Sequence, residues 1–189
     1  MQAKNTYVIR KGDMLIRPLD NAKYPEERTE VKRYNNNHII VDDRVQKIME
    51  RSCKFYGDNY AGRKLQTRRL TNIANKIPVL LTPLFPTYFF PTHSDRSVLN
   101  MWLNIHYIEQ IASCKGSRSK VYFANQEFVI IDISYHSIWH QYQNAIYYYY
   151  LMDKNARLQS SNPDEPIDYT QTRLNLFEAL SRYSLLEKK

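Results

Sequence analysis

The sequence predicts an α+β fold, with an antiparallel β-sheet or small barrel in the first two thirds and helices after it. Three observations favour this class. Short β-rich runs separated by turn residues recur up to about residue 133. An apolar helical period runs through residues 136–157, and another runs through about 170–187. Strands followed by helices are typical of an antiparallel α+β protein rather than a doubly wound one.

The first forty residues predict short strands around a polar loop. Residues 6–17 indicate two strands on either side of the turn Lys11-Gly12-Asp13, the second ending at Pro18. Residues 18–37 contain Pro25 and three consecutive asparagines, so we expect a mobile loop outside the core. Residues 38–41 are β-rich and predict a strand.

A helix is expected next. Asp42 and Asp43 can cap it, because carboxylate oxygens accept hydrogen bonds from free N–H groups. Its predicted apolar face consists of Val45, Ile48 and Met49, with Cys53 as a further candidate, while its basic residues point elsewhere. Gly57 and Gly62 are expected to bracket a turn, where glycine allows positive φ or close backbone approach. Residues 63–76 lack a clean period, which leaves strand and helix both open.

The remaining elements follow from turn residues and periodicity. Residues 79–82 and 87–90 predict a proline-bounded hairpin or edge arrangement, and 92–97 a polar loop. Residues 101–108 predict a strand, and 120–124 with 127–133 a hairpin. The helix at 136–157 carries an apolar stripe, a linker is expected at 160–166, and the final helix closes the chain. The stripe is Ile138, Tyr142, Ala145, Tyr149 and Met152, and the final apolar face is Leu174, Phe177, Leu180 and Leu185.

The positive charge is concentrated in one stretch, residues 44–76. It holds nine basic residues against two acidic ones, whereas residues 78–189 carry ten of each. Clustered positive charge attracts polyanions, of which DNA is the densest common example. Phe55, Tyr56 and Tyr60 are interleaved, so the stretch can anchor in a core while presenting Lys and Arg outward. A solvated basic face without a partner is the alternative interpretation.

Several other classes are disfavoured. There is no apolar run of about 18 residues for a membrane span, and the N-terminus lacks a secretory pattern. Cys53 and Cys114 do not form a disulfide framework, so we expect a reduced cytoplasmic setting.

Catalytic and metal-binding patterns are weak. His136 and His140 have a metal-ligand spacing, with Asp132 four residues earlier, but no zincin pattern follows. His93-Ser94-Asp95 holds triad residue types side by side, whereas triads assemble in space. Cys53 lies among basic residues, yet its place on the apolar face favours a buried thiol. We therefore expect no enzyme activity, no metal and no cofactor.

Long segments of the chain resemble one family. The residues Arg51-Ser52-Cys53-Lys54-Phe55-Tyr56-Gly57 and Tyr60-Ala61-Gly62-Arg63-Lys64 look like ComK, the competence transcription factors of Gram-positive bacteria, and most like the staphylococcal branch. The resemblance continues through 76–79, 89–92 and 131–135, and covers roughly residues 45–157. It implies a DNA-binding core at 1–157, with 158–189 as linker and C-terminal helix.

The resemblance also implies a function. ComK proteins activate genes for DNA uptake and recombination, bind two A·T-rich boxes through the minor groove, bend the DNA, and assemble from dimers into tetramers. A homodimer or tetramer on double-stranded promoter DNA in the bacterial nucleoid, working with RNA polymerase, is then expected. A MecA-type adaptor delivering the chain to the ClpC–ClpP protease is a further implied partner. The adaptor-binding segment of the bacillar proteins has no counterpart here, where residues 158–169 stand in roughly its place.

The candidate DNA contacts lie in the basic stretch. They are Arg63, Lys64, Arg68 and Arg69, with Arg51, Lys54 and Asn59 behind them. We expect the turn at Gly57–Gly62 to project Arg63 and Lys64 from a loop, because a loop enters a narrow groove more easily than a sheet face. Arg63 paired structurally with an acid such as Asp58 is the competing interpretation. The alternative function is a non-enzymatic protein–protein adaptor that uses the Tyr-rich helix.

Overall fold

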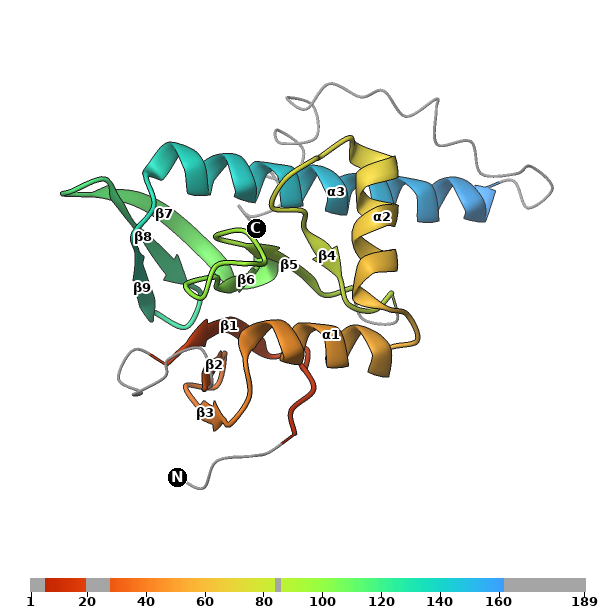
Figure 1. The fold of residues 1–189 in the computed structure, drawn as a ribbon. Helices are drawn as coiled ribbons and strands as arrows, with labels where there is room; N and C mark the ends of the chain where they lie inside the picture. Colours follow the sequence, from red (N-terminus) through yellow and green to blue (C-terminus); the bar gives the residue numbers. More distant parts are fainter. Residues whose placement is uncertain (1–5, 20–27, 84–85, 162–189) are drawn as a thin grey trace.

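In the computed structural model, which describes residues 6–19, 28–83 and 86–161, the chain folds around two antiparallel sheets (Figure 1). Within these ranges the larger sheet has the order β3-β2-β1-β6-β5-β4 and the smaller one β7-β8-β9. The α+β class is thereby confirmed. The strands are β1 (Asp13–Pro18), β2 (Thr29–Arg33), β3 (His38–Val41), β4 (Val79–Leu80), β5 (Tyr88–Pro91), β6 (Trp102–Asn104), β7 (Ile108–Cys114), β8 (Arg118–Phe123) and β9 (Phe128–Ile131).

The N-terminal region differs from its sequence prediction in two ways. Residues 6–10 are not a strand, because the Ile9 N–H donates to Ser52 Oγ and the Tyr56 hydroxyl donates to the Ile9 carbonyl. The backbone groups of Ile9 therefore bond to side chains of Ser52 and Tyr56 instead of a neighbouring strand, and β1 is the first strand of the sheet.

The second difference is that the loop predicted over residues 18–37 contains β2, which pairs with both β1 and β3. Val31 of β2 is buried, and Arg17 forms an ion pair with Glu30 at 2.6 Å. The polar residues of this segment therefore belong to a strand that contributes to the core. The asparagine run forms the turn into β3, since Asn36 adopts a positive φ of 60°. Residues 20–27 lie outside the described part of the chain.

The strand predicted over residues 101–108 is broken where the chain changes sheets. β6 ends at Asn104, the 3-10 turn η2 (Ile105–Tyr107) follows, and β7 begins the smaller sheet. The Asn104 side chain accepts a hydrogen bond from the His106 N–H, which caps the turn, and donates to the Asp13 carbonyl of β1. One polar residue thus ends one sheet and starts the path into the next. The predicted hairpins β4–β5 and β8–β9 are confirmed.

Both faces of the larger sheet are buried. On β5 and β6, Phe89 and Trp102 face one core, and Phe90 and Leu103 face the other, as the two-residue period of a strand requires. α1 (Val45–Phe55) covers the first core. α3 (Tyr135–Ser161) covers the second, together with the smaller sheet. Figure 1 shows α1 and α3 on opposite sides of the sheet.

The predicted C-terminal elements are partly described. The helix expected at 136–157 is confirmed as α3, and its predicted apolar stripe packs on the second core through residues such as Ile138, Ala145 and Tyr149. Tyr148, which was not part of the predicted stripe, is also buried there. α3 continues to Ser161, so the expected linker does not begin at residue 160. The helix predicted over 170–187 lies outside the described residues.

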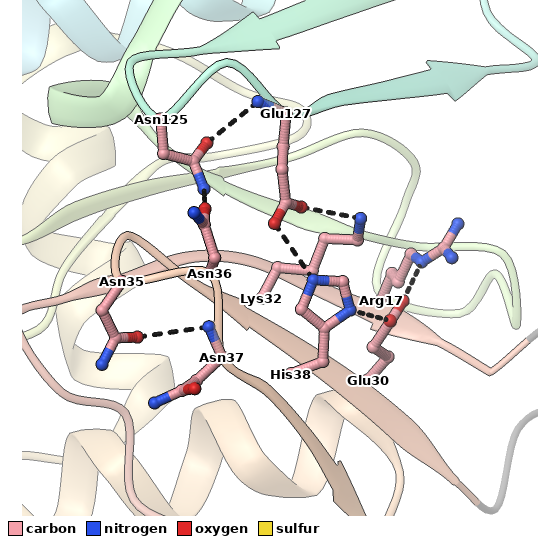
Figure 2. A network of polar contacts seen from close by, with 9 residues as sticks. All are labelled: Arg17, Glu30, Lys32, Asn35, Asn36, Asn37, His38, Asn125 and Glu127. Carbon is pink, nitrogen blue, oxygen red and sulfur yellow. Dashed lines mark hydrogen bonds and ion pairs between the residues drawn. The ribbon is translucent and has the colours of Figure 1, made fainter.

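A polar network joins the two sheets (Figure 2). Glu127, beside β9, contacts Lys32 at 2.9 Å and His38 at 3.1 Å, and His38 contacts Glu30 at 2.9 Å through its other ring nitrogen. The Asn125 amide donates to Asn36 Oδ1 at 2.7 Å. The β2–β3 hairpin and the β8–β9 turn are thereby held together by charge and amide contacts.

Candidate nucleic-acid interface

The basic stretch forms a pair of helices that meet at a tight turn. α1 ends at Phe55, and α2 (Tyr60–Thr71) begins after a connection of four residues. Gly57 in the connection has a φ of 91°, which an L side chain rarely adopts, so its expected role is confirmed. Gly62 lies inside α2 instead, where a Cβ would come within 2.9 Å of Asp58 Oδ1. Residues 63–71, left open by the sequence, are therefore helical.

The start of α1 is not capped as predicted. Arg44 is its N-cap residue, with no side-chain capping bond. The Asp43 carboxylate accepts from the Arg44 N–H and contacts Arg51 and, at 3.8 Å, Lys47. Two cations one and two turns along the helix compete successfully for the carboxylate that the sequence assigned to capping.

The inner face of α1 holds the predicted apolar residues. Val45, Ile48, Met49 and Cys53 are buried, as the spacing indicated. Burial raises the pKa of the Cys53 thiol to about 12 and outweighs the nearby Arg63 guanidinium, which lowers it. The thiol therefore stays protonated at neutral pH, which is the opposite of a reactive cysteine. The opposite face of α1 presents Lys47 and Lys54 to solvent.

Arg63 is not on a loop, and the prediction that it stays out of the core is wrong. It lies in the first turn of α2, and only 10% of its side chain is exposed. Its Nε lies 3.3 Å from Asp58 Oδ2, without hydrogen-bond geometry. The Nη2 group donates a long bond of 3.4 Å to the Tyr56 carbonyl. The guanidinium therefore braces the α1–α2 turn, which supports the competing structural interpretation.

Three other candidates also have partners inside the protein. Asn59 is the N-cap of α2, and its Oδ1 accepts from the Gly62 N–H at 2.6 Å. Lys64 contacts Asp95, and its Nζ lies 5.2 Å from the centroid of the Tyr60 ring. Arg51 contacts Asp43 and donates a long bond of 3.4 Å to the Tyr7 carbonyl. The charges of Lys64 and Arg51 are thus largely balanced where they lie.

The remaining candidates are Lys54, Arg68 and Arg69, which are all exposed. None of them forms an ion pair within the described ranges, although Arg68 donates to the Ala74 carbonyl at 3.3 Å. Arg68 and Arg69 lie outside the buried side of α2 that holds Arg63 and Thr67, and the exposed Leu65 precedes them by one turn. The structure therefore divides the seven candidates into three unbalanced surface cations and four residues with roles in the fold.

Two further cations lie at the opposite end of α1 from Lys54. Arg44 and Arg96 line a groove of about 310 Å³ between the start of α1 and the loop of residues 94–100. Arg44 belongs to the basic stretch but was not selected as a candidate. Arg96 lies 20 residues beyond it, and no local pattern could have found it, because the contact of Lys64 with Asp95 creates the proximity.

Other chemistry finds little support in the described part of the chain. No group of three or more His, Cys, Asp or Glu side chains there could hold a metal ion. His136 and His140, which have a metal-ligand spacing, are both exposed. Asp95, the acid of the run His93-Ser94-Asp95, contacts Lys64. None of the described helices is long and apolar enough to cross a membrane.

An α+β body that displays a basic helix pair has the form of a polyanion-binding protein. The chain belongs to the ComK family, whose family model, described as ComK protein, matches residues 4–157. It is also 31% identical over 109 residues to the competence transcription factor of Bacillus subtilis (strain 168). That alignment covers 58% of this chain and 55% of the relative, so the chain spans about half the length of the relative it matches. No solved structure matches the chain.

Proposed function

We propose that this protein is a DNA-binding transcriptional activator of competence genes. One observation carries the proposal: Lys54, Arg68 and Arg69 stand exposed and without acidic partners within the described ranges, on the two helices that hold the family-like residues. Unbalanced surface cations release counterions when they meet phosphates, which drives binding to DNA. The name of the Bacillus subtilis relative supplies the regulatory context.

The residues divide into contact and positioning roles. Lys54, Arg68 and Arg69 are the proposed DNA contacts, with Arg51 and Lys64 able to contribute if their acids are displaced. Arg63 and Asn59 stabilise the turn and the start of α2 through contacts within the protein, so their proposed role is in the fold rather than in contact with DNA. This revised assignment follows burial and ion pairing rather than position in the charge run.

The finer mode is also proposed. A homodimer or higher assembly binds A·T-rich boxes through the minor groove, where the narrow groove of A·T tracts concentrates negative potential and attracts Arg and Lys. RNA polymerase is the expected downstream partner in the bacterial cytoplasm. A MecA-type adaptor with ClpC–ClpP is the route of turnover that the resemblance implies, and since the bacillar adaptor-binding segment has no counterpart here, the adaptor would have to bind a different segment.

The alternative adaptor function, which would use the Tyr-rich helix, has little support in the structure, because most of these tyrosines are packed inside the protein. Of the tyrosines in the run 147–150, Tyr148 is fully buried and Tyr150 nearly so. Tyr149 packs against Tyr88 and His106, with ring centroids 5.0 and 5.3 Å away. Tyr148 and Tyr149 therefore belong to the second core, and Tyr150 packs with Leu151 and Tyr147 in a small separate cluster, so the run offers little free surface to a partner.

Fluorescence anisotropy with a two-box A·T-rich duplex and a G·C-rich duplex of equal length tests the function. We expect tighter binding to the A·T duplex and a steep loss of affinity as salt rises. Arg68→Gln with Arg69→Gln should reduce the salt slope by about two units if both meet phosphate. Light scattering on the two-box duplex measures the assembly. Affinity that is independent of salt, or equal for the two duplexes, would refute the electrostatic or the A·T-specific part respectively.

A further inference from the structure

The loop of residues 94–100 is braced on both sides. Within it, the Ser97 N–H donates to the Ser94 carbonyl at 2.9 Å, and the Asn100 N–H donates to the Ser97 carbonyl at 3.1 Å. The buried Asn100 side chain accepts from the His93 N–H at 3.0 Å, and Asp95 contacts Lys64 of α2. The loop is thus fixed to the rest of the fold, and α2 is one of its supports.

This braced loop exposes two adjacent aliphatic side chains. Val98 and Leu99 are each 57% exposed, more than any other large apolar residue in the described chain except Phe55. The Leu99 N–H donates to Ser97 Oγ at 3.3 Å, which holds the tip in its turned conformation. Since a loop with a fixed backbone cannot fold these side chains away from water, they form a preformed apolar contact point.

Cations surround the contact point. Val98 lines the 310 Å³ groove together with Arg96 on the loop, Arg44 at the N-cap of α1 and Lys47 within α1. Of the two acids of the groove, Asp95 contacts Lys64, whereas Glu50 accepts from the neutral Gln46 amide at 2.9 Å and keeps its negative charge. Lys47 lies 3.8 Å from Asp43, so Arg44 and Arg96 are the two cations that face this single carboxylate. Arg44 and Arg96 form no ion pair in the described ranges, so the groove keeps unbalanced positive charge. Its volume equals that of about ten liquid waters, which leaves room for a phosphate group.

The groove also continues the proposed DNA surface. Lys47 borders the groove and lies seven residues before Lys54, two turns away on the same side of α1. A partner that follows the exposed row of α1 therefore reaches the groove and the loop tip next. That continuity favours one long polyanion over a separate protein for this surface.

We propose that the 94–100 loop is a second DNA-contacting element, which rests on the proposed DNA binding by α1 and α2. Arg44 and Arg96 hold a backbone phosphate across the groove. Val98 and Leu99 lie against the apolar sugar and base edges beside that phosphate. The ligand class is double-stranded DNA, and the contact combines one electrostatic part with one apolar part.

The two parts give different salt signatures. Arg96→Gln should weaken duplex binding by about tenfold and reduce the salt slope by about one unit. Val98→Ser with Leu99→Ser should weaken binding by about fivefold and leave the salt slope unchanged, because apolar contact releases no counterions. Arg118→Gln and Ile130→Ser, at exposed positions on the smaller sheet, are the matched controls and should bind as the unaltered protein does.

Anisotropy titrations of the full chain with an A·T-rich duplex at several salt concentrations decide the question, and melting curves confirm that each variant is folded. If Arg68→Gln/Arg69→Gln loses affinity while both loop variants bind normally, the loop is not a DNA contact and α2 remains one. If the Val98→Ser/Leu99→Ser protein keeps its affinity for DNA but has a lower mass by light scattering, the tip packs on a second copy and the inference is wrong. If the unaltered protein does not bind the duplex, DNA binding itself fails.

Discussion

Replacing Arg63 by Ala should cost stability rather than DNA affinity. The substitution removes two buried methylenes, worth about 0.8 kcal/mol each, together with the guanidinium. The ion pair with Asp58 adds about 0.5 kcal/mol, a small value because 38% of the Asp58 side chain is exposed. The sum is about 2 kcal/mol, which corresponds to a fall in Tm of about 4–8 °C for a domain of this size.

The assay measures both quantities on one preparation. Thermal melting followed by circular dichroism gives the Tm, and anisotropy well below that temperature gives the affinity for an A·T-rich duplex. We expect Arg63→Ala to keep its affinity within about twofold once the folded fraction is accounted for. Arg63→Met retains the apolar part of the side chain and should lower the Tm by less than Arg63→Ala does.

Lys54→Ala is the matched control on the neighbouring helix. Its side chain is exposed and forms no ion pair in the described chain, so the Tm should stay unchanged while affinity falls and the salt slope drops by about one unit. An Arg63→Ala protein that melts within a degree of the unaltered one, yet binds DNA more than tenfold more weakly, would refute the structural assignment and return Arg63 to the DNA contacts.

Three further outcomes are expected. Burial alone would raise the pKa of the Glu127 carboxyl, but hydrogen bonds from Lys32 and His38 outweigh it and lower this pKa. A carboxyl whose pKa is lower in the folded state stabilises the fold above its unfolded pKa of about 4.3, and this stability is lost as the pH falls through the folded pKa. Urea unfolding at pH 6 and pH 4 should therefore show a smaller loss for Glu127→Gln than for the unaltered protein, and equal losses would remove the network from acid stability. Cys53 should resist a thiol reagent in the native state and react only in denaturant, whereas the partly exposed Cys114 reacts natively; native labelling of both thiols counts against a closed first core. Truncation after Ser160 should lower the Tm or the mass of the oligomer, and a truncated chain that melts and sediments like the full one would make the helix predicted over 170–187 a free tail.

The sequence predicted the fold class, the hairpins β4–β5 and β8–β9, and the apolar faces of α1 and α3, because each depends on local periodicity. It missed β2, since Glu30 and Lys32 look like loop residues until Arg17 and Glu127 neutralise them from other elements. It also read residues 101–108 as one strand, because the break depends on Asn104 reaching both His106 and Asp13. Long-range polar partners have no signature in a local pattern.

The candidate site was found in region and revised in detail. The charge run located the helix pair, because net charge adds up along the chain whatever the fold. Which cations are free depends on where acids lie: Asp58 is close in sequence to Arg63, but Asp95 reaches Lys64 from 31 residues away. In the same way, the fold brings Arg96 to the groove that Arg44 lines, although the two residues are far apart in the sequence.

The pairing of β1 with β6 has a consequence for the order in which the chain can acquire its structure. Leu15 pairs with Leu103, so the larger sheet closes only after more than half of the chain has left the ribosome. α1 and α2 lie inside this long closure, and two residues beneath α1, Phe89 and Trp102, come late in synthesis. Closing such a distant pairing costs loop entropy before it yields contacts, which slows folding. The residues of α1 and α2 are therefore synthesised well before the strands that hold these helices in place. The proposed DNA binding must accordingly await the completed sheet.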